Sequence, residues 1–440
     1  MSTGWQKIRL KFFAPSVRKI LPSRPKGMRY LGLENIEPGT GKLLLDTEQE
    51  QVDSSVVAFD KHSVLFGKLR PYLAKVATPD FGGVASTEMM VFEPANNNNR
   101  QFLAYSLLSD EFIKRVSGMT DGAKMPRANP GGVLNLSLCV PPSFEQKRIS
   151  AYLDKQTAKI DRLMDMRRRQ MDLLKEQRAA LIQQAVNRGL NPNAPMKDSG
   201  LPWLGEIPAH WKVAVLKWQM QIASGDSALT EALLIEPDGI SNIPAIGGNG
   251  VMGFTAKSNV SSPILAIGRV GALCGNVHFV PPPAWITDNA LMVFDVRGYS
   301  LEFLWRLLTV LNMNRLANHN AQPLITGTLV KNQRAPLPPL EEQREILEFI
   351  QVESAKFDAL HAAYARQLEL LTEYRAALIH ECVTGQRIAG VVAVDVVAVD
   401  VVAAGADSGF PPRSTRTATM GSFFCRAHRA RLQARLQVNA

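Results

Sequence analysis

Cysteine and histidine are scarce in this sequence and stand far apart. The four cysteines, Cys139, Cys274, Cys382 and Cys425, form no CxxC pair, and the seven histidines are scattered. The sequence therefore predicts neither a disulfide framework nor a metal site, and its cysteine usage fits a reducing compartment. Because no His and carboxylate pattern accompanies Cys274, a buried thiol is favoured over a nucleophile there.

Long apolar runs are lacking as well. The first residues, from Met1 to Trp5, contain no charged region followed by an apolar stretch. Nowhere does an apolar run reach the roughly 18 residues that a membrane span requires. We expect a cytoplasmic protein with no membrane association.

Motifs for catalysis are also missing. The sequence has no P-loop of the form GxxxxGK[ST], no NPP[YF] motif of amino-methyltransferases and no glycine-rich loop for S-adenosylmethionine. A metal nuclease built on Asp121, Glu145 and Lys147 is disfavoured, because metal chemistry needs clustered carboxylates. We expect no catalytic residue and no cofactor in this chain.

What the sequence does contain is a surplus of positive charge. Its 440 residues are 46% hydrophobic, enough for real cores, and carry a net charge of +10 with a pI near 9.5. Residues 1–140 hold 18 Lys and Arg against 13 Asp and Glu, whereas residues 203–337 hold 9 against 8. The surplus favours an anionic partner such as nucleic acid, and a role in solubility alone is the alternative.

An internal repeat organises the chain. The segment PPSFEQ, which begins at Pro141, returns 197 residues later as PPLEEQ at Pro338, and 20 of 48 aligned positions are identical. RAALI occurs in both copies, starting at Arg178 and at Arg375. A weaker similarity opens each half, where Trp5, Leu10 and Lys11 align with Trp211, Leu216 and Lys217. The chain is therefore a tandem of domain, helix, domain and helix.

Both repeated segments are predicted to form long helices. Pro is tolerated at a helix start, and neither Pro nor Gly then interrupts the copies before Gly189 and Gly385. Steps of seven place on one seam Leu153, Ile160, Arg167, Leu174 and Leu181 in the first copy, and Ile350, Phe357, Tyr364, Leu371 and Leu378 in the second. One copy alone has too little apolar surface to be stable in water, so each helix needs a partner. An antiparallel coiled coil of the two copies within one chain is favoured over a coiled coil that joins two chains.

These patterns predict the boundaries of the parts. They are a first domain (1–140), a first long helix (141–189), a linker (190–210), a second domain (211–337), a second long helix (338–388) and a tail (389–440). The linker is rich in Pro and Gly and shows no consistent period. The tail carries VVAVD twice, at Val391 and Val396, and ends in a basic stretch, so we expect it to be poorly ordered and dispensable.

Both domains are predicted to have an α+β fold. Strand-like runs such as Met89–Phe92 alternate with turns before a helix at Arg100–Val116. The near match of Thr87-Glu88 with Thr287-Asp288, each followed shortly by a Met-Val-Phe run, indicates that the two domains share one fold.

In the first domain, a basic stretch with one aromatic residue is the candidate DNA edge. In GKLRPYLAKV, from Gly67 to Val76, Lys and Arg flank a tyrosine at a strand exit, and DGAKMPR forms a second basic loop. Arg can hydrogen-bond guanine and Lys can neutralise phosphate, whereas a solvated basic strand is the competing interpretation. The candidates are Lys68, Arg70, Tyr72, Lys75, Thr87, Lys124 and Arg127.

In the second domain, glycines and amides are the candidate features. GGNGVMGFT, IGRVGALCGNVHF and WITDNALMVF contain glycines that permit close backbone approach and polar side chains that can read base edges, although such residues are usually just turns. The candidates are Asn249, Lys257, Arg269, Asn276, Thr287 and Asn289. The threonine with its neighbouring carboxylate would contact DNA directly or orient an arginine.

Taken together, these motifs resemble the specificity subunit of type I restriction-modification systems over about residues 5–388. PPSFEQKRI and PPLEEQREI resemble the family's helix starts, and LKEQRAALI and LTEYRAALI its helix ends. KDSGLPWLGEIPAHW resembles the family's linker into a second recognition domain. GKLRPYLAKV and GGNGVMGFT look like elements of two recognition-domain subtypes, which implies unlike half-sites. The tail beyond about Arg387 has no counterpart in the family.

The resemblance implies a non-catalytic protein whose two domains each read one half of a split double-stranded DNA target, with the helices setting the unread gap. It also implies partners. These are methyltransferase subunits, expected in two copies, that bind S-adenosylmethionine and modify adenine, and a motor-nuclease restriction subunit that cuts DNA. The candidates for docking the methyltransferase are Arg178, Leu181, Arg375 and Leu378. A coiled-coil scaffold without specific DNA recognition is the alternative function, and an autonomous enzyme is a third.

Overall fold

A computed structural model describes residues 4–44, 54–95, 97–122, 124–227, 233–317 and 323–387. Two compact units divide the chain: Met1–Ile160 with Ala376–Ala440, and Asp161–Arg375. Each unit holds one globular domain and part of both long helices, α5 (Ser143–Arg188) and α8 (Leu340–Val383). The tail predicted for residues 389–440 lies outside the described residues.

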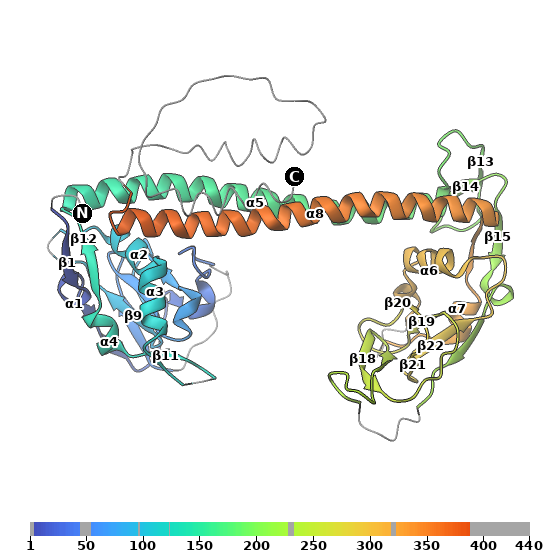
Figure 1. Ribbon diagram of the computed structural model, residues 1–440, viewed down its shortest axis with the longest axis horizontal. Helices are drawn as coiled ribbons and strands as arrows, with labels where there is room; N and C mark the ends of the chain where they lie inside the picture. The colour runs from blue at the N-terminus through green and yellow to red at the C-terminus, as the bar shows by residue number, and fades with distance from the viewer. Residues whose placement is uncertain are drawn as a thin grey trace. The chain divides into compact units, whose positions relative to one another are not determined.

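Two sheets form the first domain (Figure 1). One has the strand order β2-β9-β6-β7 with all neighbours antiparallel, and the other has the order β3-β5-β8-β4, in which β4 and β8 run parallel. Short ladders pair β1 with β12 and β10 with β11. The strands are β1 (Gln6–Arg9), β2 (Ser16–Val17), β3 (Ile20–Leu21), β4 (Tyr30–Leu31), β5 (Val56–Phe59), β6 (Val64–Gly67), β7 (Val76–Ala77), β8 (Gly83–Ser86), β9 (Met89–Phe92), β10 (Thr120–Asp121), β11 (Arg127–Ala128) and β12 (Ser137–Val140).

The helices of the first domain correct one prediction. A single helix over Arg100–Val116 is wrong, because the chain forms α2 (Arg100–Leu108) and α3 (Asp110–Ser117) with a break at Ser109. The Ser109 hydroxyl donates to the carbonyl of Ser106 at 2.7 Å and its backbone is extended, with ψ of 142°. Serine competes with helix continuation in this way. The other helical segments are α1 (Leu10–Phe13), α4 (Pro130–Asn135) and the 3-10 turns η1 (Leu33–Asn35) and η2 (Pro71–Leu73).

The second domain repeats the first sheet and has a smaller second one. The order β16-β22-β19-β20 is antiparallel throughout, and a three-stranded sheet has the order β18-β17-β21. Its strands are β15 (Lys212–Val215), β16 (Gln221–Ser224), β17 (Ile243–Gly247), β18 (Gly250–Thr255), β19 (Ile264–Gly268), β20 (Val277–Val280), β21 (Trp285–Ile286), β22 (Ala290–Phe294) and β23 (Arg334–Leu337). Its helical segments are η3 (Leu216–Trp218), α6 (Leu301–Val310), η4 (Met313–Leu316) and α7 (Gly327–Lys331).

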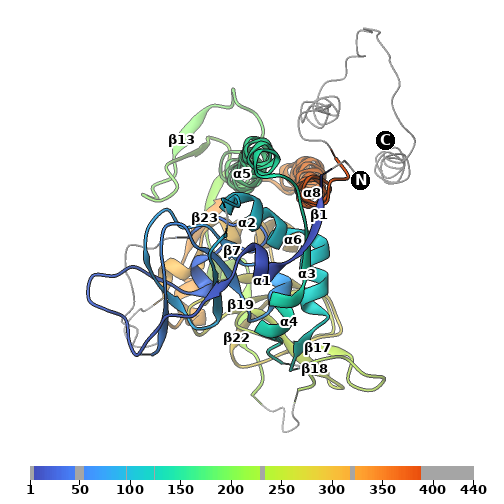
Figure 2. The ribbon, with the colours of Figure 1, turned by 90° about the vertical axis from the view of Figure 1, so that its left-hand side faces the viewer.

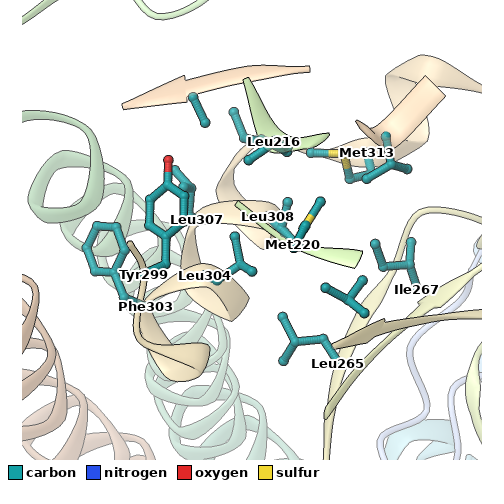
Figure 3. Close-up of a cluster of buried hydrophobic side chains, with 14 of the residues drawn as sticks. Leu216, Met220, Leu265, Ile267, Tyr299, Phe303, Leu304, Leu307, Leu308 and Met313 are labelled. Atoms are coloured by element: carbon teal, nitrogen blue, oxygen red, sulfur yellow. The ribbon is translucent and has the colours of Figure 1, made fainter. Parts of the chain in front are cut away.

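Helix α6 closes the core of this second domain (Figure 3). Its side chains Phe303, Leu304 and Leu307 are fully buried in the same cluster as Leu265 and Ile267 of β19. Complete burial of one such side chain contributes roughly 1.5–3 kcal/mol. This packing fixes the sheet whose strand ends carry the candidate DNA contacts.

The two four-stranded sheets follow the same course. In chain order, β2, β6, β7 and β9 of the first correspond to β16, β19, β20 and β22 of the second, with the same neighbours. Each domain also opens on a strand, β1 or β15, that pairs antiparallel with the last strand before a long helix, β12 or β23. The predicted α+β class and the shared fold are confirmed.

The segment before the second domain contains a hairpin that the sequence did not predict. Strand β13 (Met196–Asp198) pairs antiparallel with β14 (Glu206–Pro208), and Ile207 is fully buried. The Pro- and Gly-rich sequence predicts an irregular linker here. Strands of three residues are too short to show the alternation that identifies a strand.

Helices α5 and α8 lie side by side and antiparallel (Figure 1), and Figure 2 shows them close to end-on. In the second unit, Arg178 pairs with Asp358 at 2.7 Å, and Asp161 accepts a hydrogen bond from Arg375 at 2.8 Å. Residue numbers therefore rise along one helix as they fall along the other. The predicted antiparallel pair within the chain is confirmed.

The two long helices carry opposite charge. Helix α5 has 11 Lys and Arg against 6 Asp and Glu, whereas α8 has 4 against 9. A coiled coil of two α5 helices from different chains would bring like charges together, which is unfavourable. Arg167 stands on the predicted apolar seam because its guanidinium lies 5.0 Å from the ring centre of Tyr364, a cation–π contact. Charge and seam both favour pairing within one chain.

The repeated glutamine of PPxxEQ ties each long helix to its domain. In α8, Gln343 Oε1 accepts the N–H of Ser300 at 2.8 Å, and its Nε2 donates to the carbonyls of Gly298 at 2.8 Å and Pro338 at 2.9 Å. Ser300 is the N-cap of α6. The glutamine side chain is fully buried, so these bonds satisfy amide atoms of Gln343 that water does not reach.

Gln146 does the same in the first domain. Its Oε1 accepts the N–H of Asn99, the N-cap of α2, at 2.8 Å, and its Nε2 donates to the carbonyl of Pro141 at 3.0 Å. The repeat in sequence is thus a repeat of one helix-to-domain joint.

Candidate nucleic-acid interface

The two basic segments of the first domain meet where strand β6 ends. The N–H of Lys68 donates to the carbonyl of Glu88 at 2.8 Å, and the carbonyl of Lys68 accepts the N–H of Ala128 at 2.9 Å. Two residues on, the N–H of Arg70 donates to the carbonyl of Pro126 at 2.8 Å. These backbone bonds hold the start of GKLRPYLAKV against the end of DGAKMPR, although the two are far apart in sequence.

We call Lys68, Arg70, Glu88 and Arg127 the first strand-end cluster. Arg127 Nη2 lies 2.9 Å from Glu88 Oε1, so the carboxylate orients the arginine. Burial lowers the pKa of the Lys68 ammonium, and the nearby Arg127 and Arg18 lower it further, while Glu88 opposes the shift. An ammonium with two guanidinium groups and only one carboxylate acting on it favours the approach of an anion such as a DNA phosphate.

The remaining candidates of the first domain divide into two groups. Tyr72 and Lys124 are exposed, and Thr87 is half-buried next to Glu88. Lys75 is different, because its Nζ donates to the carbonyl of Leu33 at 2.5 Å. Its ammonium therefore fastens η1 to the sheet, and this position does not support the DNA contact predicted for it.

A second cluster stands at the equivalent place in the second domain. The N–H of Arg269 donates to the carbonyl of Asn289 at 2.9 Å, and its carbonyl accepts the N–H of Ile325 at 2.9 Å. The N–H of Gly271 donates to the carbonyl of Pro323 at 3.0 Å. These three bonds repeat those of Lys68 and Arg70. At the ends of the equivalent strands β6 and β19, the chain is therefore bonded to the same two neighbouring segments, and we call this arrangement the backbone crossing.

We call Asn249, Arg269, Asn276 and Asn289 the second strand-end cluster. Arg269 Nη1 donates to Ser224 Oγ at 3.3 Å, and Asn276 Nδ2 donates to Asn249 Oδ1 at 3.2 Å. Amide groups here replace the charged pair of the first domain. Since Asn suits adenine and Arg suits guanine, the two domains offer different chemistry to a base edge.

Glycine makes this second crossing possible. A Cβ on Gly268 would overlap the carbonyl oxygen of Gly248, which lies in the turn between β17 and β18. The close backbone approach that the glycines predicted is confirmed at this position. Lys257 lies beyond the other end of β18, so the structure does not bring it into the cluster.

The alignment of Thr87-Glu88 with Thr287-Asp288 is wrong by one residue. The carbonyl that receives the strand-end N–H belongs to Glu88 in the first domain and to Asn289 in the second. Thr287 is buried, and its hydroxyl donates to the carbonyl of Ile246 at 3.2 Å. Its role is therefore to hold the crossing together, and its position does not support a DNA contact.

Sequence reasoning missed three polar residues near the clusters. Arg18 acts on Lys68 and lies just beyond β2, a neighbour of β9, and Ser224 holds Arg269 at the end of β16. His278 on β20 lies near the β17–β18 turn, with its Nε2 buried and unbonded, and burial lowers its pKa. No local motif marks Arg18 or Ser224, because strand pairing alone brings them to the clusters. His278 lies within the segment IGRVGALCGNVHF, but nothing in that segment distinguishes it from its neighbours.

Most of the four predicted docking residues on the long helices are buried or form ion pairs within this chain. Leu378 is buried, and Arg375 is buried and bonded to Asp161. Arg178 pairs with Asp358, and Leu181 is half-buried. Leu378 and Arg375 therefore do not present their side chains to a partner.

Two classes of site are absent from the described part of the chain. Within those residues no three His, Cys, Asp or Glu side chains gather as a metal-ligand set. No helix there is both long and apolar enough to cross a membrane.

Cys274 is fully buried, as predicted, and burial raises the pKa of its thiol.

The sequence model of the type I restriction modification DNA specificity domain matches residues 34–169 and 239–370, more than half of the chain. The chain belongs to this family. Its members are specificity subunits, so this is a non-catalytic chain for DNA sequence recognition in a type I system. The two matched stretches contain both strand-end clusters.

Named relatives are similar over different lengths. The EcoprrI specificity subunit of Escherichia coli is 32% identical over 117 residues, which are 27% of this chain and 28% of that subunit. The MjaVIII specificity subunit of Methanocaldococcus jannaschii is 24% identical over 331 residues, 69% of this chain and 74% of the relative. A solved chain from work on complex assembly and conformational transition of the type I R-M system has a TM-score of 0.66 at 20% identity, covering 88% of this chain and 99% of that one. This last likeness supports the fold.

Proposed function

We propose that the chain reads a bipartite double-stranded DNA target, one half-site with each domain. The carrying observation is the backbone crossing that recurs at the ends of β6 and β19 with different side chains. A repeated frame with varied polar residues suits recognition of two unlike half-sites. The first cluster offers Lys68, Arg70 and Arg127 to phosphate and guanine, and the second offers Arg269 and amides.

In this proposal the chain performs no chemistry itself. Methyltransferase subunits, in two copies, bind S-adenosylmethionine and modify adenine, and a motor-nuclease subunit cuts the DNA. The paired helices α5 and α8 set the gap between the half-sites.

The test is to co-express the chain with a type I methyltransferase subunit and to map methylated adenines in host DNA. A split motif with a constant gap is the expected result. Arg127→Ala should relax the motif in one half only, and Arg269→Ala in the other. Lys114→Ala, an exposed cation on α3 that pairs with Asp110, is the matched control and should leave the motif unchanged.

Two other outcomes would contradict the proposal in different ways. If both arginine variants weaken binding to all sequences equally, the clusters contact phosphates and do not read bases. If random duplex competes as well as any selected duplex, the chain is a scaffold without specific recognition.

A further inference from the structure

An exposed aromatic ring occupies the same position in both domains, just after the opening strand. Phe12 follows β1 and is 65% exposed, and Trp218 follows β15 and is 68% exposed. Their positions match in the alignment that pairs Lys11 with Lys217. Single exposed apolar residues are common on proteins, but the same one in both copies of a diverged repeat calls for a shared cause.

Each ring is carried by a rigid turn. The N–H of Leu10 donates to the carbonyl of Leu136 at 2.8 Å, and in the second domain the N–H of Leu216 donates to the carbonyl of Gln333 at 2.9 Å. Leu10 and Leu216 are fully buried. The backbone on the inner side of each turn is thus held to the core, and the ring lies on the exposed side.

A lysine caps each ring. Lys11 Nζ lies 5.2 Å from the ring centre of Phe12, and Lys217 Nζ lies 4.7 Å from that of Trp218. Among the described residues, neither lysine has a carboxylate within ion-pair distance. Each ring is therefore an apolar surface with an uncompensated cation above it.

The three elements that frame each ring carry positive charge only. The sequences QKIR, LKFF and SLCV of β1, α1 and β12 contain three Lys and Arg and no Asp or Glu. The sequences KVAV, LKW and RAPL of β15, η3 and β23 contain three as well, again with no acid. A surface that combines an apolar pocket with carboxylates would be complementary to each ring and its lysine, and a protein can offer both.

We propose that Phe12 with Lys11, and Trp218 with Lys217, are two equivalent anchors, each of which holds one copy of the same acidic partner protein. The inference rests on the proposed function, in which that partner is the methyltransferase subunit. Equivalent anchors on the two copies of the repeat give a stoichiometry of two partners to one chain. The anchors lie outside both strand-end clusters, so partner binding and base reading use different residues.

The experiment measures how many methyltransferase subunits co-purify with the full chain, by native mass spectrometry. The wild-type chain should carry two. Phe12→Ala and Trp218→Ala should each carry one, because loss of an exposed aromatic anchor weakens a protein contact about tenfold or more. The double variant should carry none. Lys11→Glu and Lys217→Glu, which leave the rings in place, should repeat the single losses through charge repulsion.

The control is Phe144→Ala on the first turn of α5. Phe144 is 70% exposed but has Glu341 at its place in the second copy of the repeat, so it is not a duplicated feature. This variant should keep two partners. Two partners on every ring and lysine variant, or the same loss in Phe144→Ala, would overturn the assignment of the anchors.

Duplex binding by the same variants separates this inference from the proposed function. If the rings are anchors, the isolated variants should bind a selected duplex as the wild type does. A uniform loss of duplex binding with two partners retained would assign the rings to DNA and overturn the inference. If the wild type selects no duplex, the proposed function fails whatever the stoichiometry shows.

Discussion

Replacing Gln343 by leucine would remove the side-chain partner of three backbone groups where α8 meets α6, of which Pro338 is buried and Ser300 half-buried. These are the N–H of Ser300 and the carbonyls of Gly298 and Pro338, all within 2.9 Å of the glutamine amide. A hydrogen bond contributes about 1 kcal/mol net, and an unpaired buried group costs about 1–3 kcal/mol. Because leucine fills most of the volume but restores none of the bonds, and only the Pro338 carbonyl is fully shielded from water, we expect Gln343→Leu to lower the free energy of unfolding by about 2–4 kcal/mol.

Tryptophan fluorescence in a urea titration measures this change. Five of the six tryptophans, Trp203, Trp211, Trp218, Trp285 and Trp305, lie between Asp161 and Arg375, so the signal follows the second unit. The control is Gln351→Leu, the same substitution at an exposed position of the same helix, which should shift stability by less than about 0.5 kcal/mol. A loss below about 1 kcal/mol in Gln343→Leu would refute the reasoning that this glutamine is the helix-to-domain joint.

Three further predictions concern buried polar groups. Asp161→Asn removes the charge that faces the buried Arg375 and should cost about 1–3 kcal/mol, read from the shift in the urea midpoint. Burial raises the pKa of Tyr299, so the stability from its neutral hydroxyl is fully present below pH about 10 and is lost as the pH rises beyond it. Tyr299→Phe should flatten that fall in unfolding free energy. Burial raises the pKa of the Cys382 thiol to about 12, so at pH 8 iodoacetamide should modify the half-buried Cys139 before Cys382, as mapped by peptide mass spectrometry.

Each of these predictions has a matched control in the chain. Asp358→Asn breaks the more exposed pair with Arg178 and should cost less than about 1 kcal/mol. An equal cost would contradict the role given to burial. Tyr72→Phe, at an exposed tyrosine, should leave the alkaline fall unchanged. In urea both mapped cysteines should react at similar rates, and a slow Cys382 there would mean that burial is not what protects it.

Local pattern was enough to predict the long helices and the order of the parts. The PPxxEQ starts, the uninterrupted stretches and the glycines at the ends are signals that act within a few residues, and α5 and α8 begin and end close to them. The same signals did not predict the break at Ser109 or the short hairpin of β13 and β14. At Ser109 a single side-chain hydrogen bond decides the structure, and in the hairpin the strands are only three residues long. Both features are too short to produce a periodic pattern in the sequence.

The amino-acid sequence by itself determined the repeat, the opposite charges of the two long helices and the basic and amide-rich segments of the two domains. Only the tertiary structure decided which of these side chains meet. Lys68 and Arg127 come together because the ends of β6, β9 and β11 meet at one backbone crossing. Lys75 is not part of the first strand-end cluster, because its ammonium donates to the carbonyl of Leu33. The physical reason is that strand pairing joins residues far apart in the chain, and the register of each pair, which no local pattern contains, selects the side chains that share a surface.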